Sequence, residues 1–528
     1  MTLILILLAS FPVRVAVFGD RTGSPDDNEF EIAIDAIVEM SPDIVLSVGD
    51  FVEGNGDVAT ACEDWDSILP VLERLTSRFP FVFTPGNNDI WNDQTENYWK
   101  EYTGTEPSRI EEISGITFVI WDTSRDDCLS MDDLDLIESF IEEIDKDKPW
   151  ILVTHKPFWF MSYEDPDVVS DFKKLMTESG PLAVVGGHIH RFAADREDGV
   201  LYISAGPSGS AVPEPDPEHG NFTQFGWMTI WPDSVAYAIV DARGVYSESI
   251  NTGEEMSLFY LYRNEMIAGR QLEMEMESTV LTLRPVEDRT RTIRLSVNSG
   301  NWNLHPDTLE IELMEDPVEL HFTQSPEGSP YPSPVITIEM EYGSRNREMS
   351  FEYFWPVLRR ANAFVMEPVL DGRVSIGEYR GVFQKDFANP EGQPSDLPGT
   401  GFRAATDEKN LFLCMEMQGS SSISDDYAGF IFSSGETFYW LKVWRDGTTE
   451  ALIIPPEGEW EDWEEGYSIV VMTDDTYWCI EAAFNIPLLD PEDDFVFMHL
   501  YRVIDDDYAT WIYPIEFDAS TMGRIWLE

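Results

Sequence analysis

The alternation of short apolar runs with helical patterns over residues 13–240 constrains the fold of this chain most. Val13–Phe18 and Asp43–Val48 are predicted strands, whereas Glu29–Met40 places apolar residues at helical spacing. The same order continues to Val200–Ser204. Strands that alternate with helices indicate a layered α/β domain, in which chemistry lies on the loops that leave the strand ends. We therefore expect an α/β domain over residues 13–255.

The remainder of the chain has a different pattern. Residues 256–360 alternate apolar and polar positions with almost no helical period, and turn signals such as Asn298–Gly300 separate the predicted strands, which include Leu272–Met276. This predicts an immunoglobulin-like β-sandwich that acts as a spacer. Residues 361–528 are again β-rich but crowded with Trp and Tyr. The expected fold class is multidomain: an α/β domain followed by two all-β sandwich domains.

Charge limits the partners of the protein. The 528 residues carry 34 Lys and Arg against 99 Asp and Glu, a formal net charge of −65, while 43% hydrophobic residues suffice for real cores. A field of this sign repels phosphate backbones, which excludes non-specific binding to nucleic acid. It also disfavours anionic polymers, so a small or largely neutral substrate is preferred.

The first ten residues form an apolar run, Met1-Thr-Leu-Ile-Leu-Ile-Leu-Leu-Ala-Ser10, too short to span a bilayer. The run resembles the core of a signal peptide, although the usual positive flank is missing. We expect residues 1–12 to be the remnant of a signal peptide, and the protein to be secreted, periplasmic or at the cell surface. The alternative is a buried first strand. Since no later segment approaches 18 uncharged apolar residues, we expect no transmembrane segment.

The four cysteines, Cys62, Cys128, Cys414 and Cys479, lack CxxC spacing, which excludes a zinc ribbon. Two lie in the first third of the chain and two in the last. One bridge in each region or four free thiols are both compatible with this spacing.

Five short polar segments follow predicted strands of the first domain. They are Gly19-Asp20-Arg21-Thr22-Gly23, Gly49-Asp50, Gly86-Asn87-Asn88-Asp89, Thr154-His155-Lys156-Pro157 and Gly186-Gly187-His188-Ile189-His190. Two Asp, one Asn and three His form a mixed oxygen and nitrogen ligand set that suits Zn, Mn or Fe. One carboxylate can bridge two cations, and such a pair can clamp both oxygens of an in-line displacement while activating a water. We therefore expect two divalent metal ions.

The order of these segments resembles the calcineurin-like metallophosphoesterase superfamily over roughly residues 13–240. That family carries a GDxH, GD, GNHD/E, His, GHxH series on a two-sheet sandwich flanked by helices, with a dinuclear metal centre. The resemblance implies the following ligands: Asp20 and His190 for the first metal, Asp50 as the bridge, and Asn87, His155 and His188 for the second metal.

Two positions depart from the family pattern. Thr22 stands where the family has a ligand His, and Asn88 stands where a family His polarises the phosphoryl oxygen or protonates the leaving group. Asn can donate a hydrogen bond but cannot transfer a proton near neutral pH, and loss of a general acid costs about 10²–10⁴ in rate. We expect reduced activity, with Asn88 and Arg21 as the catalytic residues, because a guanidinium can grip a phosphate bidentately. The alternative for Arg21 is a structural arginine, and Lys156 is a lesser candidate of the same kind.

The last segment resembles family 9 carbohydrate-binding modules. The resemblance rests on Pro368–Tyr379, where Tyr379 replaces the usual Trp, on Tyr477–Pro487 and on Phe497–Arg502. Flat aromatic faces can bind sugar rings through apolar area and CH–π contact. The candidate platforms are Trp440, Trp444, Trp460 and Trp463, of which the last two lie in an acidic loop and are expected to be exposed. The alternative for each is a core aromatic.

Together these observations predict a metal-dependent phosphoesterase. It would hydrolyse a phosphomonoester or phosphodiester by metal-activated hydroxide, with a C-terminal domain that binds a polysaccharide. One alternative is a catalytically degenerate phosphoesterase fold that binds metal or a phosphorylated ligand at the cell surface without turnover. Another is a structural cell-surface protein in which the β-domains matter most.

Overall fold

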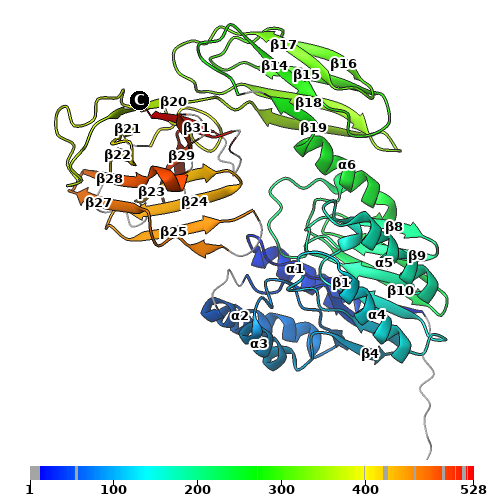
Figure 1. Cartoon of the computed structure of the whole chain (residues 1–528). Helices are drawn as coiled ribbons and strands as arrows, with labels where there is room; N and C mark the ends of the chain where they lie inside the picture. The colour runs from blue at the N-terminus through cyan, green and yellow to red at the C-terminus, as the bar shows by residue number, and fades with distance from the viewer. Residues whose placement is uncertain are drawn as a thin grey trace, which may run out of the picture. The chain divides into compact units, whose positions relative to one another are not determined.

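The structure, a computed structural model, divides into two compact units, Met1–Tyr260 and Leu261–Glu528, here unit 1 and unit 2 (Figure 1). The predicted signal peptide, residues 1–12, lies outside the described residues except for Pro12. Among the helices that the structure describes, none combines the length and apolar character needed to cross a bilayer. The described residues are 12–53, 58–269, 271–397, 399–419, 426–456, 460–489, 491, 494–505, 507–513, 519 and 521–527.

Unit 1 contains two six-stranded sheets. The first has the order β12-β11-β10-β1-β2-β3 and the second β4-β5-β6-β7-β9-β8. The strands of the first sheet are β1 (Val13–Phe18), β2 (Ile44–Ser47), β3 (Phe81–Val82), β10 (Phe225–Trp231), β11 (Ser234–Val240) and β12 (Val245–Ser247). Those of the second are β4 (Arg109–Ile113), β5 (Ile116–Ile120), β6 (Trp150–Val153), β7 (Ala183–Gly186), β8 (Ala193–Glu197) and β9 (Val200–Ser204).

The two sheets pack face to face and helices cover their outer faces. Along β1, Val15 and Val17 point into the core between the sheets, whereas Ala16 and Phe18 point toward the helices, because successive side chains of a strand alternate between faces. The helices on the first sheet are α1 (Asp27–Met40), α2 (Val58–Thr76) and α3 (Asp93–Thr103). Those on the second are α4 (Met131–Glu143) and α5 (Pro166–Ser179). The predicted two-sheet sandwich flanked by helices is confirmed.

Parallel pairing determines where the polar segments gather. In the first sheet β1, β2 and β3 are parallel, and in the second β5, β6, β7 and β9 are parallel. The carboxyl ends of parallel strands meet at one edge of a sheet. The loops after β1, β2 and β3 therefore leave one edge of the first sheet, and those after β6 and β7 leave one edge of the second.

Four further helical elements complete this region, and the last of them, α6, spans the division between unit 1 and unit 2 in the sequence. They are η1 (Phe158–Phe160), η2 (Pro217–His219), η3 (Glu248–Ile250) and α6 (Gly253–Asn264).

Unit 2 begins with two small antiparallel sheets, β13-β14-β17 and β16-β15-β18-β19. Burial alternates along β15 and β18, as expected for strands with one face toward a core. The strand predicted at Leu272–Met276 is wrong: only Leu272 makes a bridge, to Val357, and the Met276 N–H donates to the Glu273 carbonyl, which closes a turn. The strands are β13 (Ile267–Gly269), β14 (Ser278–Leu283), β15 (Arg291–Asn298), β16 (Thr308–Leu313), β17 (Val318–Thr323), β18 (Val335–Tyr342) and β19 (Arg347–Phe354).

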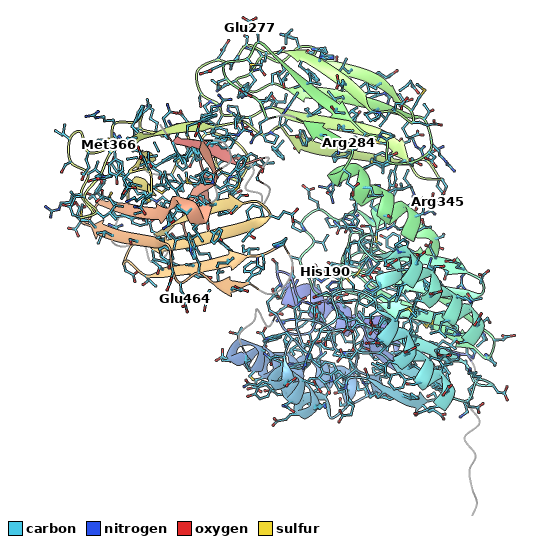
Figure 2. All side chains as sticks on the ribbon, viewed as in Figure 1. His190, Glu277, Arg284, Arg345, Met366 and Glu464 are labelled. Atoms are coloured by element: carbon cyan, nitrogen blue, oxygen red, sulfur yellow. The ribbon has the colours of Figure 1, made fainter. Side chains whose placement is uncertain are left out.

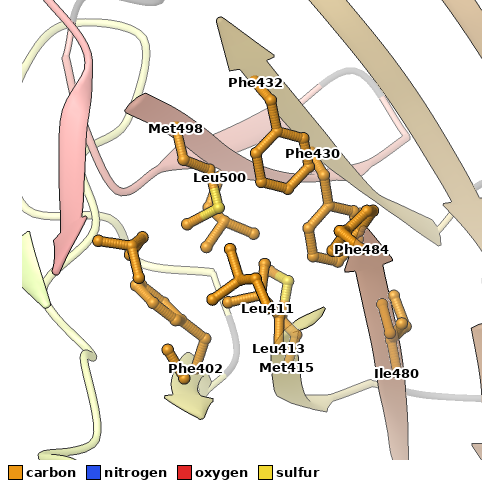
Figure 3. Packing of buried hydrophobic residues seen from close by; sticks show 14 of the residues in the cluster. Phe402, Leu411, Leu413, Met415, Phe430, Phe432, Ile480, Phe484, Met498 and Leu500 are labelled. Carbon is orange, nitrogen blue, oxygen red and sulfur yellow. The ribbon is translucent and has the colours of Figure 1, made fainter. Parts of the chain in front are cut away.

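The rest of unit 2 is one long sheet with the order β26-β25-β24-β23-β29-β31-β20-β21-β22-β28-β27, with β30 paired to β29. Phe430 and Phe432 of β23 pack against Phe484 of β28, so the two halves of this sheet enclose one apolar core (Figure 3). The elements are β20 (Arg360–Val365), β21 (Thr400–Thr406), β22 (Asn410–Gln418), β23 (Asp426–Ser434), β24 (Thr437–Trp444), β25 (Thr449–Ile454), β26 (Glu461–Asp462), β27 (Tyr467–Thr473), β28 (Tyr477–Asn485), α7 (Ile486–Leu489), β29 (Phe495–Ile504), β30 (Asp507–Thr510) and β31 (Gly523–Leu527).

β-sheet domains thus follow the α/β domain, as predicted. The boundaries at residues 255/256 and 360/361 stay predictions. All four cysteines are free thiols, with Cys414 and Cys479 buried.

Candidate metal centre

The polar segments after the strands of unit 1 are joined by backbone hydrogen bonds. The Asp20 and Arg21 N–H groups donate to the carbonyls of Gly49 and Asp50, both at 2.9 Å. The Gly187 N–H donates to the His155 carbonyl at 2.8 Å. These bonds join neighbouring loops within each sheet. Across the two sheets, the His188 N–H donates to Asp20 Oδ1 at 2.9 Å, so the side chains of the two sets of loops converge (Figure 2 labels His190).

The six predicted ligands come together in two overlapping groups. Asp20, Asp50 and His190 each offer an atom within 4.8 Å of the others, and so do Asp50, His155 and His188. The Asn87 Oδ1 lies 3.0 Å from the His155 Nε2, which places it in the second group. Asp50 belongs to both groups, as a bridging carboxylate requires.

His155 has the orientation of a metal ligand. Its Nδ1 lies 2.6 Å from the Val48 carbonyl oxygen and donates to it, which leaves Nε2 facing Asp50 Oδ2 at 3.4 Å. The His188 Nδ1 lies 3.2 Å from the same nitrogen. A histidine ligand whose other nitrogen donates to a carbonyl is fixed in tautomer and ring angle.

Divalent cations fit this donor set. Asp20, Asp50 and His155 are almost fully buried, and the Asp20 Oδ2 is a buried oxygen without a hydrogen-bond partner. A buried, unpartnered carboxylate oxygen is costly unless a cation or donor satisfies it. Oxygen and imidazole donors in this number suit Zn, Mn or Fe.

Burial and the neighbouring charges shift the pKa values of the site strongly. Burial raises the pKa of Asp20 to about 6, against the opposing effect of His190 and His155. Burial alone would lower the pKa of His155, but the charges of Asp50 and Asp20 outweigh it and raise this pKa to about 9. Burial and the neighbouring His155 lower the pKa of His188 to about 3. The two carboxylates therefore draw positive charge into the site.

The backbone of the ligands is unusual. Asp20, Asp50, His188 and His190 all have positive φ angles, between 50° and 68°. Such conformations cost about 1–3 kcal/mol each outside glycine and cluster at functional sites. Glycines make room for the carboxylates: a Cβ at Gly187 would lie 2.3 Å from Asp20 Oδ2.

Asp89 is a site residue to which the sequence analysis assigned no role. Its carboxylate accepts from the backbone N–H groups of Asp50 at 2.8 Å, Phe51 at 2.9 Å and Gly86 at 2.8 Å. Burial and the Asp50 charge raise the pKa of Asp89 to about 7. Asp89 thus joins the loop of the bridging ligand to the loop of Asn87. The sequence signal for Asp89 is its place as the last residue of the polar segment Gly86-Asn87-Asn88-Asp89, which follows a strand.

The two residues that depart from the family pattern both contact the bridging carboxylate. The Thr22 hydroxyl donates to Asp50 Oδ2 at 3.0 Å, and the Asn88 amide donates to the same oxygen at 2.8 Å. Asn88 Nδ2 also lies 3.3 Å from Thr22 Oγ1. Asn88 therefore faces the ligand set.

The Arg21 guanidinium is not free to bind a phosphate, as its predicted catalytic role requires. It is 5% exposed, its Nε donates to Asp27 Oδ1 at 2.8 Å, and its Nη1 donates to the Phe51 carbonyl at 3.0 Å. The pair with Asp27 neutralises its charge. These contacts favour the structural alternative for Arg21.

The four candidate tryptophans of unit 2 separate into an outer group and a core residue. The Trp440 Nε1 donates to the Tyr501 hydroxyl at 2.7 Å, and its ring lies 6.1 Å from that of Trp460, which is 58% exposed. Trp444 lies half-buried on β24, 5.2 Å from Tyr427. Trp463 is only 3% exposed and packs on Tyr467 at 4.8 Å. The expectation that Trp463 is exposed is wrong, because its ring belongs to the apolar core of the long sheet.

Several solved structures are similar to parts of the chain at low identity. A carbohydrate-binding module of family 9 from Caldicellulosiruptor kristjanssonii with cellotriose is 12% identical, covering 32% of this chain and 94% of that one (TM-score 0.25). GAP50, the anchor in the inner membrane complex of Plasmodium, is 14% identical, covering 45% of this chain and 88% of that one (TM-score 0.31). The phosphopantetheinyl hydrolase of Mycobacterium tuberculosis is 15% identical, covering 38% of this chain and 96% of that one (TM-score 0.26).

No curated protein matches the chain. Residues 13–192, which contain all six ligands of the two groups, match the family model of the calcineurin-like phosphoesterases.

Proposed function

We propose that unit 1 is a metal-dependent hydrolase of phosphate esters. The observation that carries the proposal is the pair of ligand groups that share Asp50. Two cations a few ångströms apart suit in-line displacement at phosphorus. The first ligand set is Asp20, Asp50 and His190, and the second is Asp50, Asn87, His155 and His188.

When bound, the cations supply Lewis acidity toward phosphoryl oxygens and lower the pKa of a coordinated water. The protein fixes the ligands. Val48 orients His155, Asp89 holds the Asp50 loop, and the Thr22 and Asn88 donors hold the Asp50 side chain.

Asn88 limits the chemistry. Its amide faces the site, where its two N–H groups donate to Asp50 Oδ2 and Thr22 Oγ1, and it carries no proton for a leaving group. We infer that esters with good leaving groups, such as activated aryl phosphates, are hydrolysed faster than alkyl phosphates. The absent general acid accounts for a loss of about 10²–10⁴ in rate for the latter.

Metal content and turnover test the proposal together. The full chain is loaded with Zn, Mn or Fe, analysed for bound metal, and assayed with activated aryl phosphate mono- and diesters. His188→Ala should lose metal and turnover, whereas His321→Ala, an exposed histidine of unit 2, should lose neither. Absence of metal from the wild-type chain would refute the proposal.

A second candidate is a binding protein of the same fold without turnover. Thr22 and Asn88 favour it, because Thr22 stands in place of a family ligand histidine, Asn88 stands in place of the family proton donor, and both are bonded to Asp50. Metal binding without hydrolysis of any activated ester would support this function over the first.

For unit 2 we propose polysaccharide binding by the outer face of β24. The Trp440 and Trp460 rings lie together, and Lys442 Nζ lies 4.4 Å from the Trp440 ring centroid, so apolar faces and polar groups adjoin. Trp440→Ala and Trp460→Ala should each weaken retention on an insoluble polysaccharide. Trp231→Ala, a partly exposed tryptophan of unit 1, is the control and should not.

We also propose that the protein works outside the cytoplasm, on the support of the apolar run Leu3–Ala9. Fractionation of cells that express the full chain tests this, and retention in the cytoplasm would contradict it.

A further inference from the structure

A cavity of about 530 Å³ lies in unit 2, away from the β24 face. Its lining includes residues of the segment before β21 and of the neighbouring strands β21, β22 and β28, whereas β24 belongs to the other half of the long sheet. Met415 and Met417 of β22 belong to the core, so Glu416 between them points outward. Sites for small molecules in proteins have volumes of about 300–1,000 Å³, and this cavity falls in that range.

A charged pair in the wall of the cavity is held by its neighbours. The Arg403 Nη1 donates to Glu416 Oε2 at 2.6 Å, and the Tyr477 hydroxyl donates to Glu416 Oε1 at 3.1 Å. The guanidinium carbon of Arg403 lies 4.6 Å from the centroid of the Phe383 ring. The side chains of the pair are 27% and 26% exposed. The pair is thus fixed in place before a ligand arrives and is still open to one.

The wall also offers polar groups that the described residues leave unpaired. Lys385 and Gln418 line the cavity and are exposed. In the described part of the chain, neither the Lys385 ammonium nor the Gln418 side-chain amide has a hydrogen-bond or ionic partner. The Nε and Nη2 groups of Arg403 have no hydrogen-bond acceptor there either. A ligand can therefore bond to these groups without displacing a protein partner.

The lining carries positive charge in a strongly acidic chain. Lys385 and Arg403 are cations, and Glu416 is the only acidic side chain among the described residues that line the cavity, although the chain has 99 acidic and 34 basic residues. An excess of one cation suits a ligand with one carboxylate. Phe383 and Tyr477 add flat aromatic faces to the same wall, which suit an apolar ring face.

We propose that this cavity binds a sugar acid, a saccharide unit that carries one carboxylate. The cations receive the carboxylate, the aromatic rings receive the C–H face of the sugar, and Glu416 and Gln418 accept hydrogen bonds from its hydroxyls. A plain aromatic acid has no hydroxyl to donate to Glu416, and a neutral sugar has no charge for Lys385. A ligand with both kinds of group therefore matches the lining best.

Glucuronate is the probe, and its binding to the full chain is measured by calorimetry. Two comparison molecules each lack one feature: glucose lacks the carboxylate, and benzoate lacks the hydroxyls. We expect glucuronate to bind at least about tenfold more tightly than either. Equal binding of glucose would overturn the role of the cations, and equal binding of benzoate would overturn the assignment to a sugar.

Two exposed residues of the wall can be changed without disturbing the core. Lys385→Met should bind glucuronate about fivefold more weakly, as expected for a solvent-exposed ion pair, and glucose as the wild type does. Gln418→Leu should weaken glucuronate binding and leave benzoate unchanged. Lys409→Met, an exposed lysine in the turn between β21 and β22 and outside the cavity lining, is the matched control and should bind glucuronate as the wild type does.

The outcomes separate this site from the functions proposed above. A wild type that does not bind glucuronate, or a Lys385→Met variant that binds it unchanged, would overturn the proposal. Loss of glucuronate binding in Trp440→Ala, with full binding in Lys385→Met, would place the sugar acid on the β24 face instead. These measurements need neither metal nor turnover, so their result is independent of the proposed phosphoesterase.

Discussion

At the scale of single residues, the centre is built from conformations that most sequences avoid. Four ligands have left-handed backbones, and glycines stand where a side chain would collide with a carboxylate. Each feature is unfavourable alone, and each orients one ligand atom. Such strain persists only where the surrounding structure over-determines it, here through the hydrogen bonds that join the loops.

Gly187 tests this packing. A Cβ there would lie 2.3 Å from Asp20 Oδ2 and 2.7 Å from Val48 Cγ2, so Gly187→Ala must displace Asp20. We expect this variant to lose the cation of the first site and keep that of the second, as measured by elemental analysis. Gly244→Ala, where a Cβ would meet no atom within 4 Å, should keep both. Full metal content in Gly187→Ala would show that Asp20 is not a ligand.

Asp89 tests the connection between loops. In Asp89→Asn, an NH₂ group would face backbone donors that now bond to a carboxylate. Each buried donor left unpaired costs about 1–3 kcal/mol, and we expect the unfolding free energy of unit 1 to fall by at least this much in chemical denaturation. Asp198→Asn, in an exposed left-handed turn that Asn tolerates, should have no effect. Equal stability of the two variants would contradict the role of Asp89.

At the scale of elements, much of the centre could be predicted because each ligand directly follows a strand. The sequence shows the apolar run, then Gly and Asp or His, and parallel strands bring such ends to one edge. It does not show what a side chain does once its neighbours are in place. Arg21 is paired by Asp27 from the start of α1, and Trp463 turns inward from an acidic loop. The contact of Arg21 with the Phe51 carbonyl and that of the Trp463 ring with Tyr439 join distant segments, which a local pattern does not contain.

Glu481 of β28 anchors the turn at Asp371 and Gly372 to the long sheet. Its Oε2 accepts from the N–H groups of Asp371 at 3.0 Å and Gly372 at 2.7 Å, and its Oε1 accepts from the Tyr379 hydroxyl at 3.1 Å. Burial raises the pKa of Glu481 although these donors lower it. The folded state thus holds the proton more tightly than the unfolded state, so the contribution of this carboxyl to stability falls as pH rises from 4 to 7.

Glu481→Gln removes this titration. The unfolding free energy of the wild type minus that of the variant should therefore be more positive at pH 4 than at pH 7. Denaturant titrations followed by the fluorescence of unit 2 measure it. Glu436→Gln, in an exposed turn, should show no such dependence. A difference that grows with pH would mean that the hydrogen bonds of Glu481 outweigh its burial.

At the scale of the whole molecule, the division of the chain into two units separates the chemistry. All six candidate ligands lie between residues 20 and 190, and the candidate sugar platforms lie between residues 440 and 460. The acidic charge of the whole chain favours cations and opposes anionic substrates. If unit 1 acts on phosphate esters as proposed, bound cations would therefore have to offset this charge where the phosphate binds.

The same division predicts how the protein responds to metal. A ligand that binds only the folded state adds about 2.7 kcal/mol to stability at a concentration of 100 Kd. Since the ligands belong to unit 1 alone, metal should raise the thermal transition of unit 1 and leave that of unit 2 in place, as seen by calorimetry of the full chain. In His188→Ala the shift should shrink or vanish. A metal-dependent shift of both transitions would mean that the units unfold together, and a shift of unit 2 alone would place the metal elsewhere.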